Sequence, residues 1–202
     1  MISNKGGFYT TAFVPPLTEQ TDAEGNKTYF RYNVINKLKQ VWNDGSDRIE
    51  SYTYYTNGLT KTKKDKNGVT TTYEYDCHGR QKKVAAGSLS VSYTYDGNGN
   101  QLTMTDSTGT TVWTYDDLNR VLTKNVPKFG TTAYTYDITS GVAAGFTAEQ
   151  AKDPKGNITT KVFDKAGRIK YVYDGSLTST SKTEYNYYDN GNRQNVIYPN
   201  GY

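Results

Sequence analysis

The chain holds one cysteine and one histidine, and the two are adjacent at Cys77 and His78. A thiol beside an imidazole can act as a nucleophile with its general base. Neighbouring residues of a strand point apart, however, and a similar segment of the chain has Gly97 and Asn98 at the equivalent positions. A zinc site needs three or four ligands, which this pair cannot supply. We therefore expect no catalytic residue and no metal ligand here.

Aspartates are the other residues whose spacing could carry chemistry. Asp96-Gly-Asn-Gly-Asn100 resembles the start of a calcium loop, but Gln101 and Ser107 stand where an EF-hand loop needs glycine and glutamate. A glycosidase would need two carboxylates at unique positions. Here five aspartates share one position of a recurring segment: Asp76, Asp96, Asp116, Asp137 and Asp164. We interpret them as turn residues, and we expect no cofactor.

Eight segments share one pattern, in which two aromatic residues flank a third residue and a turn follows; the copy that begins at Lys161 has only the second aromatic. The clearest copies are Tyr73-Glu-Tyr-Asp-Cys-His-Gly-Arg80, Tyr93-Thr-Tyr-Asp-Gly-Asn-Gly-Asn100 and Trp113-Thr-Tyr-Asp-Asp-Leu-Asn-Arg120. Weaker copies begin at Phe30, Tyr52, Tyr134, Lys161 and Tyr185. The second aromatic recurs at steps of 20 to 27 residues. Such regularity identifies a tandem repeat.

Alternation along a strand places the two aromatic rings of a copy on one face and the residue between them on the other. Seven of the eight intervening residues are polar, and the exception is Val162. The second aromatics are therefore predicted to form a structural ladder that stacks repeat on repeat. The ladder residues are Tyr32, Tyr54, Tyr75, Tyr95, Tyr115, Tyr136, Phe163 and Tyr187.

A hairpin turn is predicted after the ladder residues. An aspartate at its start can accept hydrogen bonds from backbone N–H groups two residues on. Glycine or asparagine three residues later tolerates the positive φ that a hairpin connection requires. The predicted turn residues are Asp76, Gly79, Asp96, Gly99, Asp116, Asn119, Asp164 and Gly167.

A second turn, such as Asp65-Lys-Asn-Gly68, divides each period into two short strands. We expect an all-β chain of about sixteen strands, in tandem antiparallel hairpins that form a curved or spiralling continuous sheet. Residues 1–17 lack the motif and are interpreted as a leader or an added end, and the array spans 18–202. An inserted loop is predicted at 138–152, where Thr147-Ala-Glu-Gln150 has capping-box spacing and indicates one helical turn.

Composition supports a β structure, with 20 tyrosines, 19 glycines and frequent threonine. The net charge of +4 is mild and spread along the chain, which favours a solvated surface over a nucleic-acid surface. One cysteine excludes an internal disulfide. No apolar run is long enough to span a membrane as a helix. The first residues lack the basic-then-apolar pattern of a signal peptide.

The copies Tyr73-Glu-Tyr-Asp76 with Gly79-Arg80, and Trp113-Thr-Tyr-Asp116 with Asn119-Arg120, resemble the YD repeats of the Rhs/YD-repeat family. The Asp-x-x-Gly turns that follow extend this resemblance over roughly residues 20–202. Similar members include bacterial Rhs and wall-associated polymorphic toxins, the C-type component of insecticidal Tc toxins, and animal teneurins. The resemblance implies a β-sheet strip that spirals into a hollow shell, which in the bacterial toxins encloses a C-terminal toxic domain.

The chain departs from complete members of that family in three respects. It has too few repeats to close a large shell, and it lacks both the terminal core region with its self-cleaving protease motif and a variable toxin domain. We therefore expect a segment of a longer protein that is secreted or lies at the cell surface. Its expected partners are the adjacent repeats and the toxin domain of that protein.

The leading hypothesis is a structural segment, not an enzyme, of a shell that encloses or delivers a toxin. The alternative is a surface module whose exposed rings bind carbohydrate or a partner protein. The lysines of Lys61-Thr-Lys-Lys64 and Lys82-Lys83 are interpreted as solvated rather than as nucleic-acid contacts. Unpaired strand edges at the ends of the array, in particular Gln194-Asn-Val-Ile-Tyr198, predict that the chain self-associates or that its own terminal segments protect these edges.

Overall fold

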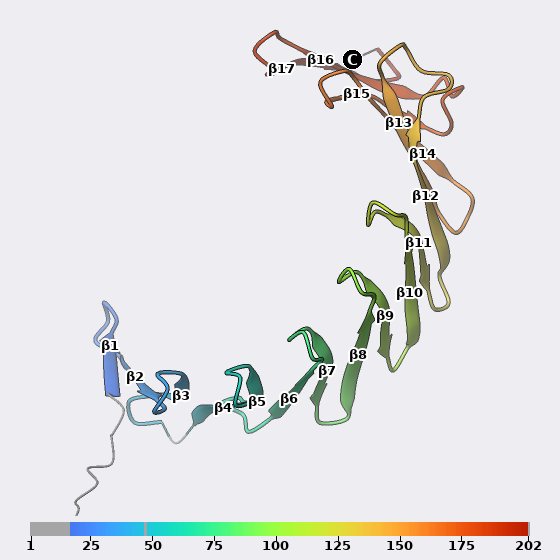
Figure 1. The fold of residues 1–202 in the computed structure, drawn as a ribbon. Helices are drawn as coiled ribbons and strands as arrows, with labels where there is room; N and C mark the ends of the chain where they lie inside the picture. Colours follow the sequence, from blue (N-terminus) through green and yellow to red (C-terminus); the bar gives the residue numbers. More distant parts are fainter. Residues whose placement is uncertain (1–16, 47, 202) are drawn as a thin grey trace, which may run out of the picture. The chain divides into compact units, whose positions relative to one another are not determined.

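The computed structural model describes residues 17–46 and 48–201, which form seventeen β-strands (Figure 1). These residues contain no helix that could cross a membrane. The predicted all-β fold of tandem hairpins is confirmed. The strands are β1 (Leu17–Thr21), β2 (Lys27–Tyr32), β3 (Leu38–Asn43), β4 (Ile49–Tyr54), β5 (Thr60–Lys64), β6 (Thr70–Tyr75), β7 (Gln81–Ala86), β8 (Leu89–Tyr95), β9 (Gln101–Asp106), β10 (Gly109–Tyr115), β11 (Val121–Val126), β12 (Gly130–Ile138), β13 (Thr147–Lys152), β14 (Ile158–Phe163), β15 (Ile169–Asp174), β16 (Lys182–Tyr187) and β17 (Arg193–Ile197).

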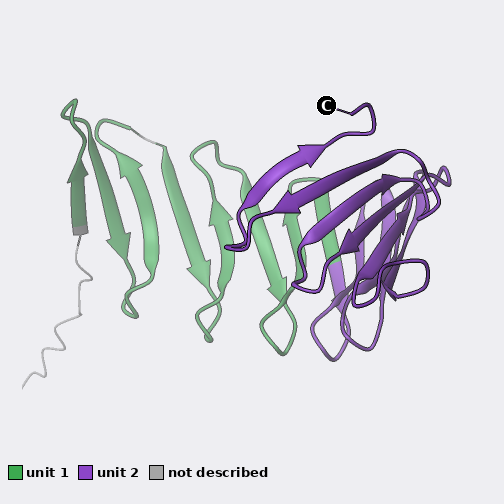
Figure 2. Ribbon diagram, turned by 90° about the horizontal axis from the view of Figure 1, so that it is seen from above, with its two compact units in different colours: residues 1–92 green, residues 93–202 purple. Residues whose placement is uncertain are grey.

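The strands belong to one antiparallel sheet in which strands that follow one another in sequence pair side by side. The chain divides into two units, residues 1–92 and 93–202, coloured green and purple in Figure 2. Within the first unit the strands run side by side with turns at alternate ends. Within the second unit the direction of successive strands changes progressively, as the twist of a β-sheet requires.

Hairpins that contain the aromatic motif carry a β-bulge at the turn end. In β14 and β15, for example, Val162 pairs with Tyr171 and Phe163 pairs with Ile169, which leaves Lys170 as the extra residue. The same shift of register occurs in the hairpins β2–β3, β4–β5, β6–β7, β10–β11 and β16–β17. A bulge of this kind redirects the extra side chain and increases the local twist.

The two faces of the sheet differ in burial. All eight ladder residues are half-buried, whereas six of the eight residues between the aromatic pairs are exposed. We call this second face the polar face. On it the intervening residue lies opposite the residue nine positions later, except that Thr135 lies opposite Gln150. Threonine hydroxyls meet there in three hairpins: Thr53 with Thr62 at 2.6 Å, Thr94 with Thr103 at 2.6 Å, and Thr114 with Thr123 at 2.7 Å.

Val162 is the exception on the polar face, because its side chain is only 2% exposed. The loop after β15 covers this region, since the hydroxyl of Thr160 donates a hydrogen bond of 2.7 Å to the carbonyl of Gly175. The loop between β12 and β13 meets it, because a methyl group placed on Gly141 would lie 3.5 Å from Leu177 Cδ1. In the described residues, the buried side chains are Thr111, Ala148, Thr160 and Val162.

The structure corrects two expectations. The helical turn predicted at 147–150 is wrong, because these residues form part of β13, where Gln150 pairs with Thr135 on one side and Thr160 on the other. Only residues 139–146 separate β12 from β13. Asp137 does not start a turn, since it lies in β12 with a φ of 57°. The leader predicted for residues 1–17 lies outside the described residues, apart from Leu17 at the start of β1.

Candidate functional site

The turn that follows β10 shows how the repeated motif folds locally. Oδ1 of Asp116 accepts hydrogen bonds from the backbone N–H groups of Leu118, at 2.9 Å, and Arg120, at 2.8 Å. The N–H of Asn119 donates to the Asp116 carbonyl at 3.0 Å, and Asn119 has a φ of 62°. The turns that start at Asp76, Asp96 and Asp164 repeat these bonds, with Gly79, Gly99 and Gly167 at φ values of 80°, 96° and 74°.

Gly167→Val is expected to lower the free energy of unfolding by about 1–3 kcal/mol, because a β-branched residue is strained at positive φ. Steric crowding is not the cause of this loss, since nothing lies within 4 Å of a Cβ added at Gly167. Gly167→Asn should be nearly neutral, as Asn119 holds the equivalent position. Gly97→Val is the matched control, because Gly97 has equal space and no positive φ. Equal losses in urea denaturation for the two valine variants would contradict this account.

An arginine at the last position of the turn joins one repeat to the next. Nε of Arg120 donates to Oδ2 of Asp116 at 2.7 Å, and its guanidinium lies 4.4 Å from the ring centre of Tyr136. Nη2 of Arg120 also contacts Asp137, at 2.7 Å.

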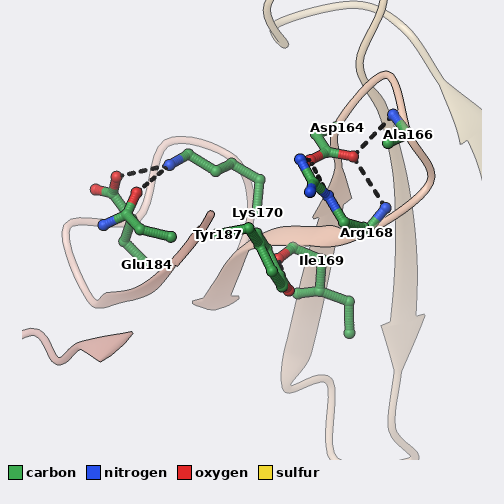
Figure 3. Close-up of polar contacts among 8 residues, drawn as sticks. Asp164, Ala166, Arg168, Ile169, Lys170, Glu184 and Tyr187 are labelled. Atoms are coloured by element: carbon green, nitrogen blue, oxygen red, sulfur yellow. Dashed lines mark hydrogen bonds and ion pairs between the residues drawn. The ribbon is translucent and has the colours of Figure 1, made fainter. Parts of the chain in front are cut away.

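Arg168 repeats this arrangement with Asp164, at 2.9 Å from Nε to Oδ2, and with the ring of Tyr187, at 4.6 Å (Figure 3). Arg80 makes the same bond to Asp76, at 2.6 Å. The arginine of one turn therefore bridges its own aspartate and the ladder tyrosine of the next repeat.

Ladder tyrosines also bind the backbone of the preceding repeat through their hydroxyl groups. The hydroxyl of Tyr136 donates to the carbonyl of Val121 at 2.8 Å, and that of Tyr187 donates to Ile169 at 2.7 Å. Tyr54 and Tyr115 make equivalent bonds to the first strand residue after the earlier turn, Leu38 and Gln101. Sequence reasoning missed these bonds and the arginine contacts, although arginine at the last turn position was a visible signal.

Hydrogen bonding and burial shift the pKa values of these groups. The side-chain amide of Asn100, followed by turn N–H groups, lowers the pKa of Asp96 below its usual value, although partial burial opposes this. At Asp116 burial raises the pKa, but bonds from the Arg120 backbone and side chain outweigh it, so the pKa is lowered. Burial raises the pKa of the Tyr136 phenol. These hydrogen bonds therefore favour the ionised form of Asp96 and Asp116.

The array is expected to lose stability in acid. A carboxyl group whose folded pKa is depressed contributes stability that is fully present above its unfolded pKa, near 3.9, and is lost as pH falls through the folded value. Melting temperature should therefore stay level down to about pH 5 and fall below about pH 4. Asp116→Asn should reduce this fall, whereas Asp117→Asn, at the exposed neighbouring position, should leave it unchanged. An identical fall in both variants would show that other groups cause the acid dependence.

The residues considered for chemistry lie in the turns that follow β6 and β8. Sγ of Cys77 lies 3.3 Å from Nδ1 of His78, and both side chains are exposed in the turn after β6. No group of three or more metal-ligating side chains occurs in the described parts of the chain. Asp96 and Asn100 bond to one another, at 2.8 Å, within the turn. The contacts described above join neighbouring repeats in a chain built from tandem β-hairpins.

Comparisons with known proteins identify the family. A sequence model of the teneurin YD-shell matches residues 59–200, more than half of the chain, so the chain belongs to the teneurin YD-shell family. A comparison with curated proteins gave no match.

Solved structures show the same fold at low sequence identity. TcdB2-TccC3 without its hypervariable C-terminal region has a TM-score of 0.53 at 18% identity; the match covers 88% of this chain and 9% of that one. TcdB2-TccC3-TEV has a TM-score of 0.51 at 16% identity, over 89% and 13% of the two chains. This chain thus spans a small part of each.

Proposed function

We propose that this chain is a structural segment of a longer secreted or cell-surface protein, whose β-shell encloses or delivers a C-terminal toxin domain. The recurrence of one contact unit carries the proposal: aspartate, turn N–H groups, arginine and the next ladder tyrosine meet in the same way at the turns that start at Asp116 and Asp164. Such a unit binds its neighbours rather than a substrate. The ladder and turn residues are accordingly structural, and the segment has no enzymatic activity of its own.

Limited proteolysis of the full-length parent protein tests enclosure. A region C-terminal to the repeats should resist protease while the repeats are folded, and should be cleaved at once after mild denaturation. The same C-terminal region expressed alone is the control and should be cleaved without delay. Equal cleavage rates for the enclosed and isolated forms would contradict the proposal. A negative-stain image of the parent protein would show the shell directly.

A groove in the first unit supports carbohydrate binding as a second candidate function. The cavity, of about 560 Å³, is lined by residues that include Tyr32, Tyr52 and Tyr54 together with Arg31 and Lys39. Aromatic faces with a few polar groups suit sugar rings. A glycan array should then show binding that Tyr52→Ala weakens. Binding that persists in this variant would place the sugar elsewhere.

A second copy of the chain, bound through an open strand edge, is the last of the proposed partners. Among the described residues β17 pairs with β16 alone, and its outer edge carries no charged residue from Gln194 to Ile197. Ile197 and Tyr198 are 42% and 54% exposed. An open edge of this composition can pair with a second chain. Light scattering should therefore show mass that rises with concentration, and a constant monomer mass would contradict pairing.

A further inference from the structure

The amine of Lys170 lies against two side chains of the neighbouring strand β16. Nζ of Lys170 is 2.9 Å from Oε1 of Glu184 (Figure 3). The same atom is 2.5 Å from Oδ1 of Asn186. The Lys170 and Glu184 side chains are only 21% and 28% exposed. The ring of Tyr171 lies 5.4 Å from the same amine. An amine, a carboxylate and a carboxamide thus converge at a partly buried point of the second unit.

We propose that Lys170 and Asn186 form an intramolecular amide bond that joins β15 to β16, with Glu184 as the catalytic acid and base. Nζ of Lys170 attacks Cγ of Asn186, so the Nζ–Cγ bond forms and the Cγ–Nδ2 bond breaks. Glu184 accepts a proton from the attacking amine and delivers a proton to Nδ2, which leaves as ammonia. The reaction consumes no oxidant, reductant or cofactor.

The fold supplies the positioning that this reaction requires. Strand pairing places Tyr171 opposite Glu184, and the bulge turns Lys170 toward the same part of β16. Because Oδ1 and Cγ of Asn186 are bonded to one another, an amine 2.5 Å from Oδ1 is also close to Cγ. Groups held in this way react as if at very high concentration, up to about 10⁵–10⁸ M. Only the neutral amine is a nucleophile, and Glu184 is in place to take its proton.

The carboxamide is held in a fixed orientation for attack. Its Nδ2 donates a hydrogen bond of 2.9 Å to Oδ1 of Asn195 in β17, while Oδ1 points to the amine. Lysine recurs at the bulge position in three other hairpins, as Lys39, Lys61 and Lys82. At Lys170 the bulge lysine meets both a carboxylate and a carboxamide, and this combination provides all the groups of the reaction.

Mass spectrometry of the whole purified chain tests the proposal. The chain, incubated at neutral and mildly alkaline pH, is expected to weigh less than its sequence by one ammonia molecule. Trypsin should fail to cut after Lys170 and should release segment 169–182 joined to segment 183–193. A full mass with normal cleavage after Lys170, in a chain whose circular dichroism shows the β fold, would overturn the proposal.

Variants distinguish formation of the cross-link from other reactions that release ammonia, such as those at Asn-Gly turns. Lys170→Arg and Asn186→Ala each remove a reacting group, so both variants should keep the full mass. Glu184→Gln removes only the proton acceptor and should also keep the full mass. Lys182→Arg is the matched control, because Lys182 contacts the same ring, at 4.6 Å from Tyr171, yet has no part in the reaction. The Lys182→Arg variant should therefore still lose one ammonia molecule. If Glu184→Gln folds and forms the joined segments at the normal rate, Glu184 is not the catalyst and the mechanism is wrong.

Discussion

Replacing Tyr136 with alanine is expected to lower the free energy of unfolding by about 3 kcal/mol, at the lower end for truncation of a large aromatic side chain. The ring is half-buried under the guanidinium of Arg120, and its hydroxyl binds the carbonyl of Val121. The substitution removes the ring and the hydrogen bond together. Tyr136→Phe removes the hydrogen bond alone and should cost about 1 kcal/mol.

Urea denaturation of these variants measures both effects. Thr135→Ala is the matched control, because Thr135 is the adjacent residue of the same strand and is exposed on the polar face. Its cost should be within about 0.5 kcal/mol of zero. A loss at Thr135 as large as that at Tyr136 would show that the two faces are assigned wrongly.

Val162→Asp is expected to have a larger effect, above about 4 kcal/mol, because it places a charged carboxylate at a buried position. Thr114→Asp changes the equivalent motif position in another repeat, where the side chain is exposed. It should cost less than about 1 kcal/mol. The loss of stability in the two variants is compared by measuring their melting temperatures. A mild effect at both positions would mean that the loops after β12 and β15 do not cover Val162 in solution.

The spacing of aromatic pairs predicted the hairpins correctly because it reflects local rules. Alternation sets which side chains share a face, and the residues that form each turn are adjacent in sequence. The same reasoning failed at 147–150, where the capping-box spacing indicated a helical turn. There β12 and β14 supply hydrogen-bond partners for β13 on both sides, which a local pattern cannot show.

Contacts between repeats also could not be predicted from local rules. Val162 occupies the position that is exposed in six other copies of the motif, but loops distant in sequence bury it. Likewise, Lys170 and Asn186 lie sixteen residues apart, and only the bulge in β15 brings the amine to the carboxamide. The roles assigned to the ladder and turn residues remain proposals, which the variants of Tyr136 and Gly167 test.

The bonds made by the ladder tyrosines give the array a direction. Tyr136 depends on Arg120 and Val121 of the repeat before it, and Tyr187 depends in the same way on Arg168 and Ile169. Each repeat thus docks onto a surface that was synthesised earlier, so a nascent chain can add folded repeats in the order in which the ribosome releases them. An array with this polarity needs no completed downstream repeat to begin folding, and removal of its last repeat leaves the earlier arginine–aspartate pairs intact.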